Sequence, residues 1–257
     1  MPRWKLTLEY DGRRFVGWQR QENGPSVQQA VEEAFTRFSG ETVRLACAGR
    51  TDAGVHALGQ VAHADLNRVF PSETIRNALN HHLAAWPVSV LAVEAVSDDF
   101  HARFSCCGRR YRYRILNRRP PPALDAGRVW HVRRPLAVEA MAAAARVLVG
   151  HHDFTTFRAT LCQAKSPLRT LDQLDVLAVG EEIHILAAAR SFLHHQVRNM
   201  VGTLAAVGSG QWEVARVAQA LAARDRRAGG PTAPAEGLYF IAALYPANPS
   251  YPASNPA

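Results

Sequence analysis

One succession of apolar patterns occurs twice along the chain of 257 residues, and this repeat limits the possible folds more than any other feature. Alternating apolar residues indicate strands, and apolar residues three and four apart indicate helices. In the first half these patterns predict strand 4–10, helix 26–40, strands 42–48 and 59–66, helix 72–83 and strand 88–96. In the second half they predict strand 109–116, helix 136–150, strands 171–179 and 183–193, helices 195–207 and 212–223, and strand 237–244.

Both halves therefore show the order strand, helix, two strands, helix, strand. A unit of this order forms an antiparallel sheet with helices on one face, the ferredoxin-like arrangement. We predict an α+β fold in which two tandem βαββαβ units join into one continuous, mainly antiparallel sheet, with a catalytic cleft between the halves. The domains are expected at residues 1–104 and 105–246. Residues 247–257 are rich in Pro, Ala, Ser and Asn and are expected to form a flexible tail.

The charge balance points to a polyanionic partner. The chain has 30 Lys and Arg against 22 Asp and Glu, a net charge of +8, and only Lys5 and Lys165 are lysines. Arginine forms paired hydrogen bonds with phosphate and stacks on bases, so this composition suits a nucleic acid. An arginine bias from a GC-rich coding background is the alternative that charge alone leaves open.

Membrane and secretory roles are not indicated. No segment approaches the roughly 18 consecutive apolar residues of a membrane span, and the first residues lack a signal-peptide pattern. The four cysteines have neither the spacing of a zinc site nor the density of a disulfide framework. We therefore expect a cytoplasmic protein that binds no membrane.

The stretch AGRTDAGVHALGQVAH, residues 48–63, contains the candidate reactive group. Gly49 and Gly54 relax the backbone around Asp52, so a sharp loop can present its carboxylate at the end of the sheet. A structural role is the alternative, because aspartate often caps its own turn. The loop alone favours the structural role.

Two segments of the second half change this balance. The alternation in RRYRYRIL, residues 109–116, puts arginines on one face of a strand and Tyr111 with Tyr113 on the other. Bases stack on such rings while arginines hold phosphates, although an aromatic core face with a solvated basic face is the structural alternative. On the helix predicted from His195, Arg198 lies beside apolar residues and needs a counter-charge, for which Asp52 is the candidate.

Eleven histidines, including three adjacent pairs, raise the question of a metal site. The chain has no H-E-x-x-H motif, and adjacent residues on a helix point about 100° apart, so a pair such as His194 and His195 is expected to be a poor two-ligand site. We therefore expect no metal. The alternative is a metal-dependent nuclease that uses histidines with Asp52 or Asp153.

A second alternative is a non-catalytic RNA-binding module, because the RNA recognition motif has the same element order. That motif expects a basic-Gly-aromatic-Gly string with spaced aromatic residues on its third strand. The corresponding strand here, GQVAHADL, has none, which disfavours this alternative.

From Tyr10 to about Leu244 the chain resembles the tRNA pseudouridine synthase A family, the tRNA pseudouridine(38–40) synthases. The resemblance is carried by the stretches YDGRRFVGWQRQ, SVQQAVEEAF, AGRTDAGVHALGQVAH, FHARFSCCGRRYRYRI, GHHDFTTF, SFLHHQVRNMVGTL and GLYF. The string GRTDAGVHA is highly specific, and the other stretches follow in the order that the family has.

The resemblance implies a cofactor-free isomerase, acting as a homodimer, that converts uridine to pseudouridine at positions 38, 39 and 40 in the anticodon stem-loop of tRNA. It implies that Asp52 is the catalytic nucleophile. Arg50 would help to displace the target base and fill the vacated space, Tyr111 would stack on that base, and Arg198 would pair with Asp52. Neither a metal nor another cofactor is implied.

The reaction replaces an N1–C1′ bond by a C5–C1′ bond without gain or loss of atoms, so no redox group is needed. An aspartate, whose reference pKa is about 3.9, is ionised at neutral pH. The carboxylate could attack the sugar carbon or the base, or remove the 2′ proton, and the sequence leaves these routes open. Tyr111 could hold the detached base and also take the C5 proton.

Overall fold

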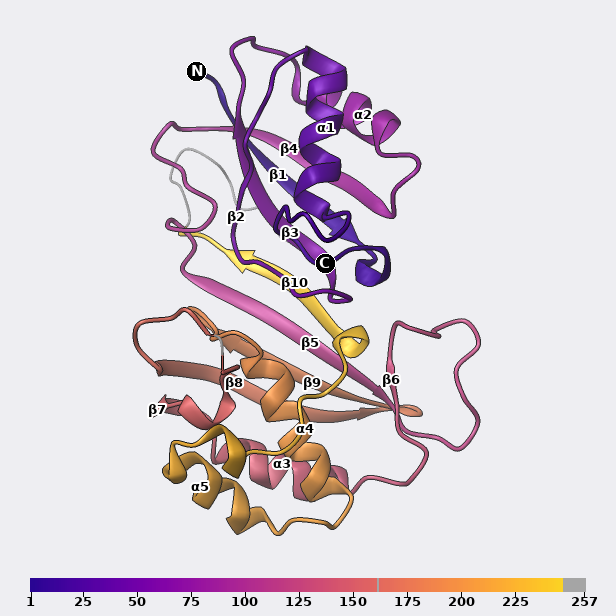
Figure 1. Ribbon diagram of the computed structural model, residues 1–257, viewed down its shortest axis with the longest axis vertical. Helices are drawn as coiled ribbons and strands as arrows, with labels where there is room; N and C mark the ends of the chain where they lie inside the picture. Colours follow the sequence, from indigo (N-terminus) through magenta and orange to yellow (C-terminus); the bar gives the residue numbers. More distant parts are fainter. Residues whose placement is uncertain (161, 247–257) are drawn as a thin grey trace.

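The computed structural model describes residues 1–160 and 162–246, so the predicted tail 247–257 lies outside the described residues. A ten-stranded sheet extends through both halves, with helices α1 to α5 beside it (Figure 1). The N-terminal half contains β1 (Arg3–Tyr10), α1 (Val27–Ser39), β2 (Ala46–Cys47), β3 (His56–Asp65), α2 (Ser72–His82) and β4 (Val88–Val96). The C-terminal half contains β5 (Gly108–Leu116), β6 (Trp130–His131), α3 (Val138–Arg146), β7 (Gly150–Asp153), β8 (Leu168–Val179), β9 (Glu182–Ala189), α4 (Gln196–Gly208), α5 (Val214–Ala223) and β10 (Leu238–Leu244).

The order of strands confirms the predicted fold class. The strands follow one another as β4-β1-β3-β10-β5-β9-β8-β7, with β2 paired to β3 and β6 to β5. In the N-terminal half the first strand, β1, lies between β4 and β3, and in the C-terminal half the first strand, β5, lies between β10 and β9, all in antiparallel pairs. Two ferredoxin-like units therefore share one sheet. The division of the chain after residue 104 stays a prediction.

The halves join at a seam where β3 and β10 run side by side in parallel, with Phe240 opposite Ala57. Gly59 makes the close approach possible, because a Cβ there would lie 2.5 Å from the carbonyl oxygen of Ile241. A larger residue at this position would push the two strands apart.

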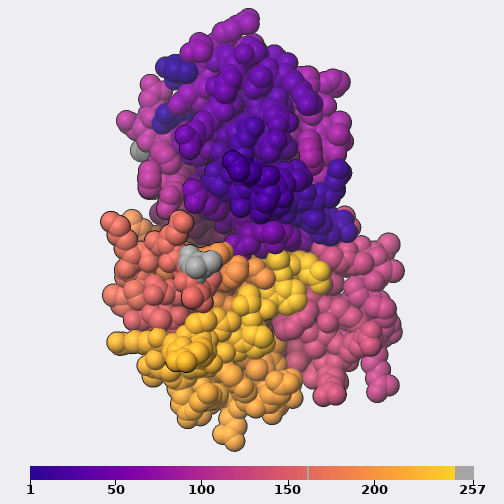
Figure 2. Space-filling view, in the orientation of Figure 1, coloured from indigo at the N-terminus to yellow at the C-terminus, as the bar shows by residue number. Residues whose placement is uncertain are grey.

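Each half has its own buried core, and at the seam residues of each half also pack into the core of the other. Phe240, from the C-terminal half, is fully buried in the core of the N-terminal half. Val55, from the N-terminal half, is buried in the core of the C-terminal half. Figure 2 shows the two halves in contact across the middle of the molecule. Burial of apolar surface on both sides holds the seam closed.

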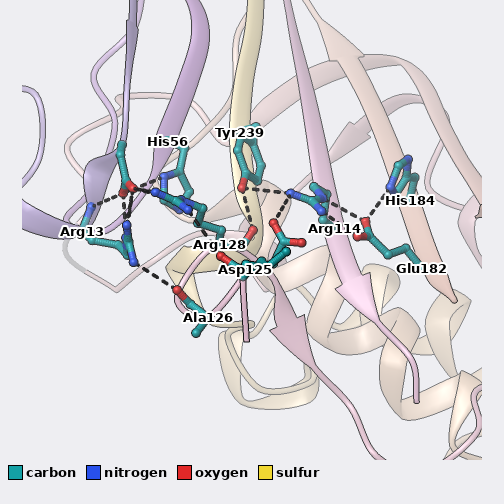
Figure 3. A network of polar contacts seen from close by, with 11 residues as sticks. Arg13, His56, Arg114, Asp125, Ala126, Arg128, Glu182, His184 and Tyr239 are labelled. Atoms are coloured by element: carbon teal, nitrogen blue, oxygen red, sulfur yellow. Dashed lines mark hydrogen bonds and ion pairs between the residues drawn. The ribbon is translucent and has the colours of Figure 1, made fainter. Parts of the chain in front are cut away.

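A set of polar contacts, called here the seam network, also crosses from one half to the other (Figure 3). It comprises Asp11, Arg13, His56, Arg114, Asp125, Arg128, Glu182, His184 and Tyr239. Arg128 binds Asp11 at 3.0 Å, and the carbonyl of Arg128 accepts a hydrogen bond from the Tyr239 hydroxyl at 2.6 Å. Arg114 donates to both carboxylate oxygens of Glu182, at 2.6 and 2.8 Å. The loop 117–129 thereby ties the first turn of the chain to the C-terminal part of the sheet.

Individual residues explain where α1 begins and ends and where β8 turns into β9. Ser26 caps α1 by accepting a hydrogen bond from the backbone N–H of Gln29 at 3.2 Å, and Gly40 ends the helix with φ 74°. Gly180, with φ 60°, turns the chain between β8 and β9. The Gln29 side chain donates to Glu33 rather than back to Ser26, so only one of the two hydrogen bonds of a capping box forms.

Three predicted elements are clearly shorter than expected. Of strand 42–48 only β2 is present, because the backbone N–H of Leu45 donates to the Glu32 carboxylate instead of to a neighbouring strand. The helix predicted over 136–150 ends at Arg146, and Gly150, with φ 115°, begins β7. The strand predicted to reach 193 ends at Ala189. Neither β6 nor β7 was predicted, because two-residue and polar segments carry no apolar alternation.

None of the helices in residues 1–160 and 162–246 is long and apolar enough to cross a membrane.

Candidate active site

Asp52 lies in the loop between β2 and β3, and the N-terminal turn of the chain holds this loop in place. Gly17 and Asp52 form an antiparallel bridge, and the backbone N–H of Trp18 donates to the Thr51 carbonyl at 3.0 Å. Gly17 has φ 119°, and a Cβ there would lie 2.7 Å from the Thr51 carbonyl oxygen, so the contact requires glycine. The Asp52 side chain is 26% exposed. Its carboxylate is therefore accessible on a backbone that is fixed.

Buried polar side chains from both halves donate hydrogen bonds to the backbone of the Asp52 loop. Gln60 donates to the Gly49 carbonyl at 2.7 Å. Arg109, from β5, donates to the Ala48 carbonyl at 3.1 and 2.7 Å and is itself buried. Sequence reasoning did not identify Arg109, although the alternation in RRYRYRIL places it on the same face of β5 as Tyr111 and Tyr113. A buried arginine that saturates backbone carbonyls positions the loop without needing a carboxylate partner.

Arg198 approaches Asp52 from the other half, on α4. Its Nη1 lies 3.4 Å from Asp52 Oδ2, which is the contact expected from the sequence. Its Nε donates to the Ala233 carbonyl at 2.8 Å, and the Ala233 N–H donates back to the Arg198 carbonyl at 3.1 Å. Gly202 lets this segment cross the helix, since a Cβ there would lie 1.8 Å from the Pro231 carbonyl oxygen. The guanidinium is thus fixed in direction before it meets Asp52.

His194 and His195 also face Asp52, which corrects the expectation that the two adjacent side chains point in different directions. The Nε2 of His194 lies 3.2 Å from Asp52 Oδ1, and the Nε2 of His195 lies 3.3 Å from Asp52 Oδ2. The argument about helical directions fails because the pair precedes the helix: His195 is the N-cap residue of α4, with φ 61° and ψ 6°. This left-handed residue turns both rings to the same side, with ring centroids 4.0 Å apart. Nothing in the local sequence predicts that backbone conformation for a histidine.

The donor atoms of this cluster are close enough for an ion. In residues 1–160 and 162–246, Asp52, His194 and His195 are the one group of three such side chains whose ligand atoms lie within 4.8 Å of one another. Burial lowers the pKa of His195, against the attraction of the Asp52 carboxylate, which raises it. The neutral imidazole is the form that binds metals.

Tyr111 and Tyr113, which the sequence places on one face of β5, differ in their surroundings. Tyr113 is fully buried, and its hydroxyl donates to the Pro234 carbonyl at 2.7 Å, so it is a core residue. Tyr111 is half-buried at the seam, in edge contacts with Phe192 and Phe240 at centroid distances of 5.1 Å. Burial raises the pKa of Tyr111, and the neighbouring Tyr10 and Asp52 raise it further. It is therefore a neutral phenol, which weighs against the role of proton acceptor and suits stacking.

Arg50, two residues before Asp52, is exposed. Within the part of the chain that the structure describes, its guanidinium makes neither a hydrogen bond nor an ion pair with the protein, so its donors remain available to an incoming group.

His56, from the same motif, has a structural position instead. Its Nδ1 accepts from the backbone N–H of Gly12 at 3.1 Å, and its ring stacks on Tyr239 at 4.7 Å.

Comparison with known proteins gives a consistent result. A family model described as tRNA pseudouridine synthase matches residues 7–105 and 144–246. The chain is 67% identical over 245 residues to tRNA pseudouridine synthase A of Rhodospirillum centenum, covering 95% of this chain and 100% of that protein. It is 60% identical to tRNA pseudouridine synthase A of Paramagnetospirillum magneticum, covering 96% of this chain and 97% of that protein. It is 59% identical to the protein of the same name from Caulobacter sp. strain K31, covering 95% and 98%.

Proposed function

Because the chain belongs to the tRNA pseudouridine synthase family, we propose that it acts on uridines 38, 39 and 40 of the anticodon stem-loop, with Asp52 as its nucleophile. The protein is an enzyme, an isomerase that converts uridine to pseudouridine in tRNA. The proposal concerns three further points: which uridines are modified, which residues carry out the reaction, and whether the enzyme acts as a homodimer. The observation that carries it is the accessible Asp52 carboxylate at the seam, with Arg198 of the opposite half 3.4 Å away.

The Asp52 carboxylate reacts with the target nucleotide and is regenerated when the rotated base has rejoined the sugar. The N1–C1′ bond breaks, the C5–C1′ bond forms, the proton on C5 leaves and N1 gains a proton, so the atoms balance without a redox partner. Attack on the sugar, attack on the base and removal of the 2′ proton remain three routes for the same carboxylate. Arg198 orients the carboxylate in each of them, because its own direction is fixed by Ala233.

Tyr111 and Arg50 stabilise the target base outside its stack. Tyr111 lies on the C-terminal side of the seam, close enough to Asp52 for the carboxylate to raise its pKa, and its ring stacks on the flipped uracil. Flipping a base out of its stack costs a few kcal/mol. The unpaired Arg50 guanidinium enters the vacated space and offsets part of this cost. The phenol holds the detached base while it turns.

The partners follow from charge and size. A net charge of +8 suits a polyanion such as tRNA. One seam covers only a small part of a tRNA, so a homodimer in which each tRNA touches both subunits gives the larger surface that specific binding needs. The reaction is proposed to proceed in the cytoplasm without a metal or another cofactor.

The test incubates purified protein with unmodified tRNA in a buffer that contains a chelator and no nucleotide, followed by mapping of pseudouridine at single positions. We expect product at positions 38, 39 and 40. Asp52→Asn is expected to reduce turnover by at least about 10,000-fold, because the nucleophile is lost, while tRNA binding in a gel-shift assay is retained. Asp172→Asn, an exposed carboxylate on β8, is the matched control and should leave turnover unchanged. Product at other positions, or near-normal turnover by Asp52→Asn, would contradict the proposal.

A further inference from the structure

His194 and His195 are not used in the proposed reaction, although both approach the reacting carboxylate. Each imidazole Nε2 lies beside a different oxygen of Asp52, at 3.2 and 3.3 Å. The unusual backbone of His195 produces this arrangement. A non-glycine residue in the left-handed region is uncommon, and such residues are often found at functional sites.

We propose that Asp52, His194 and His195 form a binding site for a divalent transition-metal ion, with Zn²⁺ as the type, and that the bound ion inhibits the enzyme. The distances support it. Zinc binds imidazole nitrogen and carboxylate oxygen at about 2.1 Å, so ligand atoms around a tetrahedral ion lie about 3.4 Å apart. The His194 Nε2–Asp52 Oδ1 distance of 3.2 Å is close to that edge length. One ligand atom from each of the three residues lies within 4.8 Å of the others, so small side-chain rotations can complete the set.

The donor set decides the class of ion. Two imidazoles and one carboxylate suit borderline cations such as Zn²⁺, Ni²⁺ and Cu²⁺, whereas Mg²⁺ and Ca²⁺ prefer oxygen ligands only. The three side chains are between 26% and 44% exposed, so an ion can enter and a water molecule can complete the coordination. The site is therefore selective against the Mg²⁺ that accompanies tRNA.

The charge around the cluster sets how firmly the ion is held. The Arg198 guanidinium lies 3.4 Å from Asp52 Oδ2 and is tethered to Ala233, so it cannot move far from a second cation. This repulsion makes binding weaker than at a structural zinc site with the same ligands. The site is thus reversible, and a chelator should empty it.

Inhibition follows because the ion occupies the oxygens that must react. A carboxylate that coordinates a metal is a poor nucleophile and a poor base, and the ion also fills the space in front of it. This consequence rests on the proposed role of Asp52. Binding of the ion rests on geometry alone, so the two can fail separately.

The test measures Zn²⁺ binding to the metal-free protein by calorimetry and, separately, the effect of Zn²⁺ on turnover. His194→Asn/His195→Asn removes two of three ligands and is expected to weaken Zn²⁺ binding by at least about 100-fold. His194→Asn alone, at a residue whose side chain is 44% exposed, provides a variant that should fold normally and bind at least about 10-fold more weakly. The matched control is His81→Asn/His82→Asn, an adjacent pair at the end of α2.

For turnover, each variant is compared with its own rate in chelator, which also removes the effect of Zn²⁺ on the RNA. Wild type and His81→Asn/His82→Asn should lose activity as the site fills, recover it on addition of chelator, and show no effect of Mg²⁺ at the same concentration. The inhibition curve of the His194/His195 double variant should shift by the same factor as its binding. Unchanged Zn²⁺ affinity in that double variant, or equal binding of Mg²⁺, overturns the site. Normal turnover with the site saturated overturns the proposed inhibition and the reacting role of Asp52 on which it rests, while the binding site itself stands.

Discussion

Two polar clusters cross the seam between the halves, and they differ in how completely their charges are paired. In the seam network, Asp11 accepts from Arg13 at 2.6 Å and from Arg128 at 3.0 Å, and Glu182 accepts from Arg114 at 2.6 Å. Around Asp52, the three nearest nitrogens lie at 3.2, 3.3 and 3.4 Å. The contacts in the seam network are short and its carboxylates are fully paired. The contacts of Asp52 are longer, and its carboxylate can accept a further partner.

The difference distinguishes a carboxylate that stabilises the fold from one that can react. Short contacts to several donors lower the free energy of a carboxylate and remove it from chemistry, which is useful where two halves must stay in register. Asp52 is held by its backbone instead, through Gly17 and Trp18, so its side chain keeps accessible lone pairs. The same kind of residue therefore has opposite roles on one seam.

Removing the tethered cation at Asp52 should give the largest effect of this comparison. Arg198→Gln is expected to lower the single-turnover rate about 100-fold, because the carboxylate loses its orienting partner, while tRNA binding changes little. Arg198→Lys restores charge but cannot contact both Ala233 and Asp52, so it should recover only part of the rate. A rate within twofold of wild type for Arg198→Gln would mean that the contact is incidental.

In the seam network the corresponding change should act on stability. Glu182→Gln leaves Arg114 and His184 without their carboxylate partner, at side chains that are 18% and 17% exposed. We expect a loss of about 2 kcal/mol in the free energy of unfolding, measured by urea denaturation. Turnover per folded molecule should be unchanged. A large loss of turnover with normal stability would reverse the assignment of roles to the two clusters.

Asp11 allows the same comparison by pH. Burial raises the pKa of its carboxyl, but hydrogen bonds from Arg13 and the nearby His56 and Arg128 outweigh burial and lower the pKa to about 2. A lowered pKa stabilises the fold above the unfolded value of about 3.9, and this contribution is lost as the pH falls towards about 2. Because the side chain remains 17% exposed, solvent screening reduces the contribution to about 1.5 kcal/mol.

Asp11→Asn should therefore be less stable than wild type at pH 6, and the difference should shrink progressively below pH 4. Urea denaturation of both proteins at pH 6, 4 and 3 measures this. A difference that stays constant with pH would show that the charge of Asp11 does not contribute.

The sequence predicted the fold because periodicity decides which residues are buried, and the alternation along β1, β5 and β9 is strong. It predicted the Asp52–Arg198 contact because a half-buried arginine needs a partner. It did not predict that His194 and His195 would turn toward Asp52, because that depends on one backbone conformation at His195. The seam network was not predicted for another reason: its residues come from six separate segments that only the tertiary fold brings together.

The smallest effect should come from a pair that matches the seam network in distance but not in burial. Arg227 binds Asp225 through Nη2 at 2.7 Å and through Nε at 3.0 Å, much as Arg114 binds Glu182, yet its side chain is 91% exposed. Water competes for both groups there, so the pair gains little over its solvated state. Arg227→Gln should leave the urea midpoint unchanged under the conditions in which Glu182→Gln lowers it. A comparable loss in both variants would mean that a short distance alone stabilises an ion pair, and the contrast between the two seam clusters would then lose its physical basis.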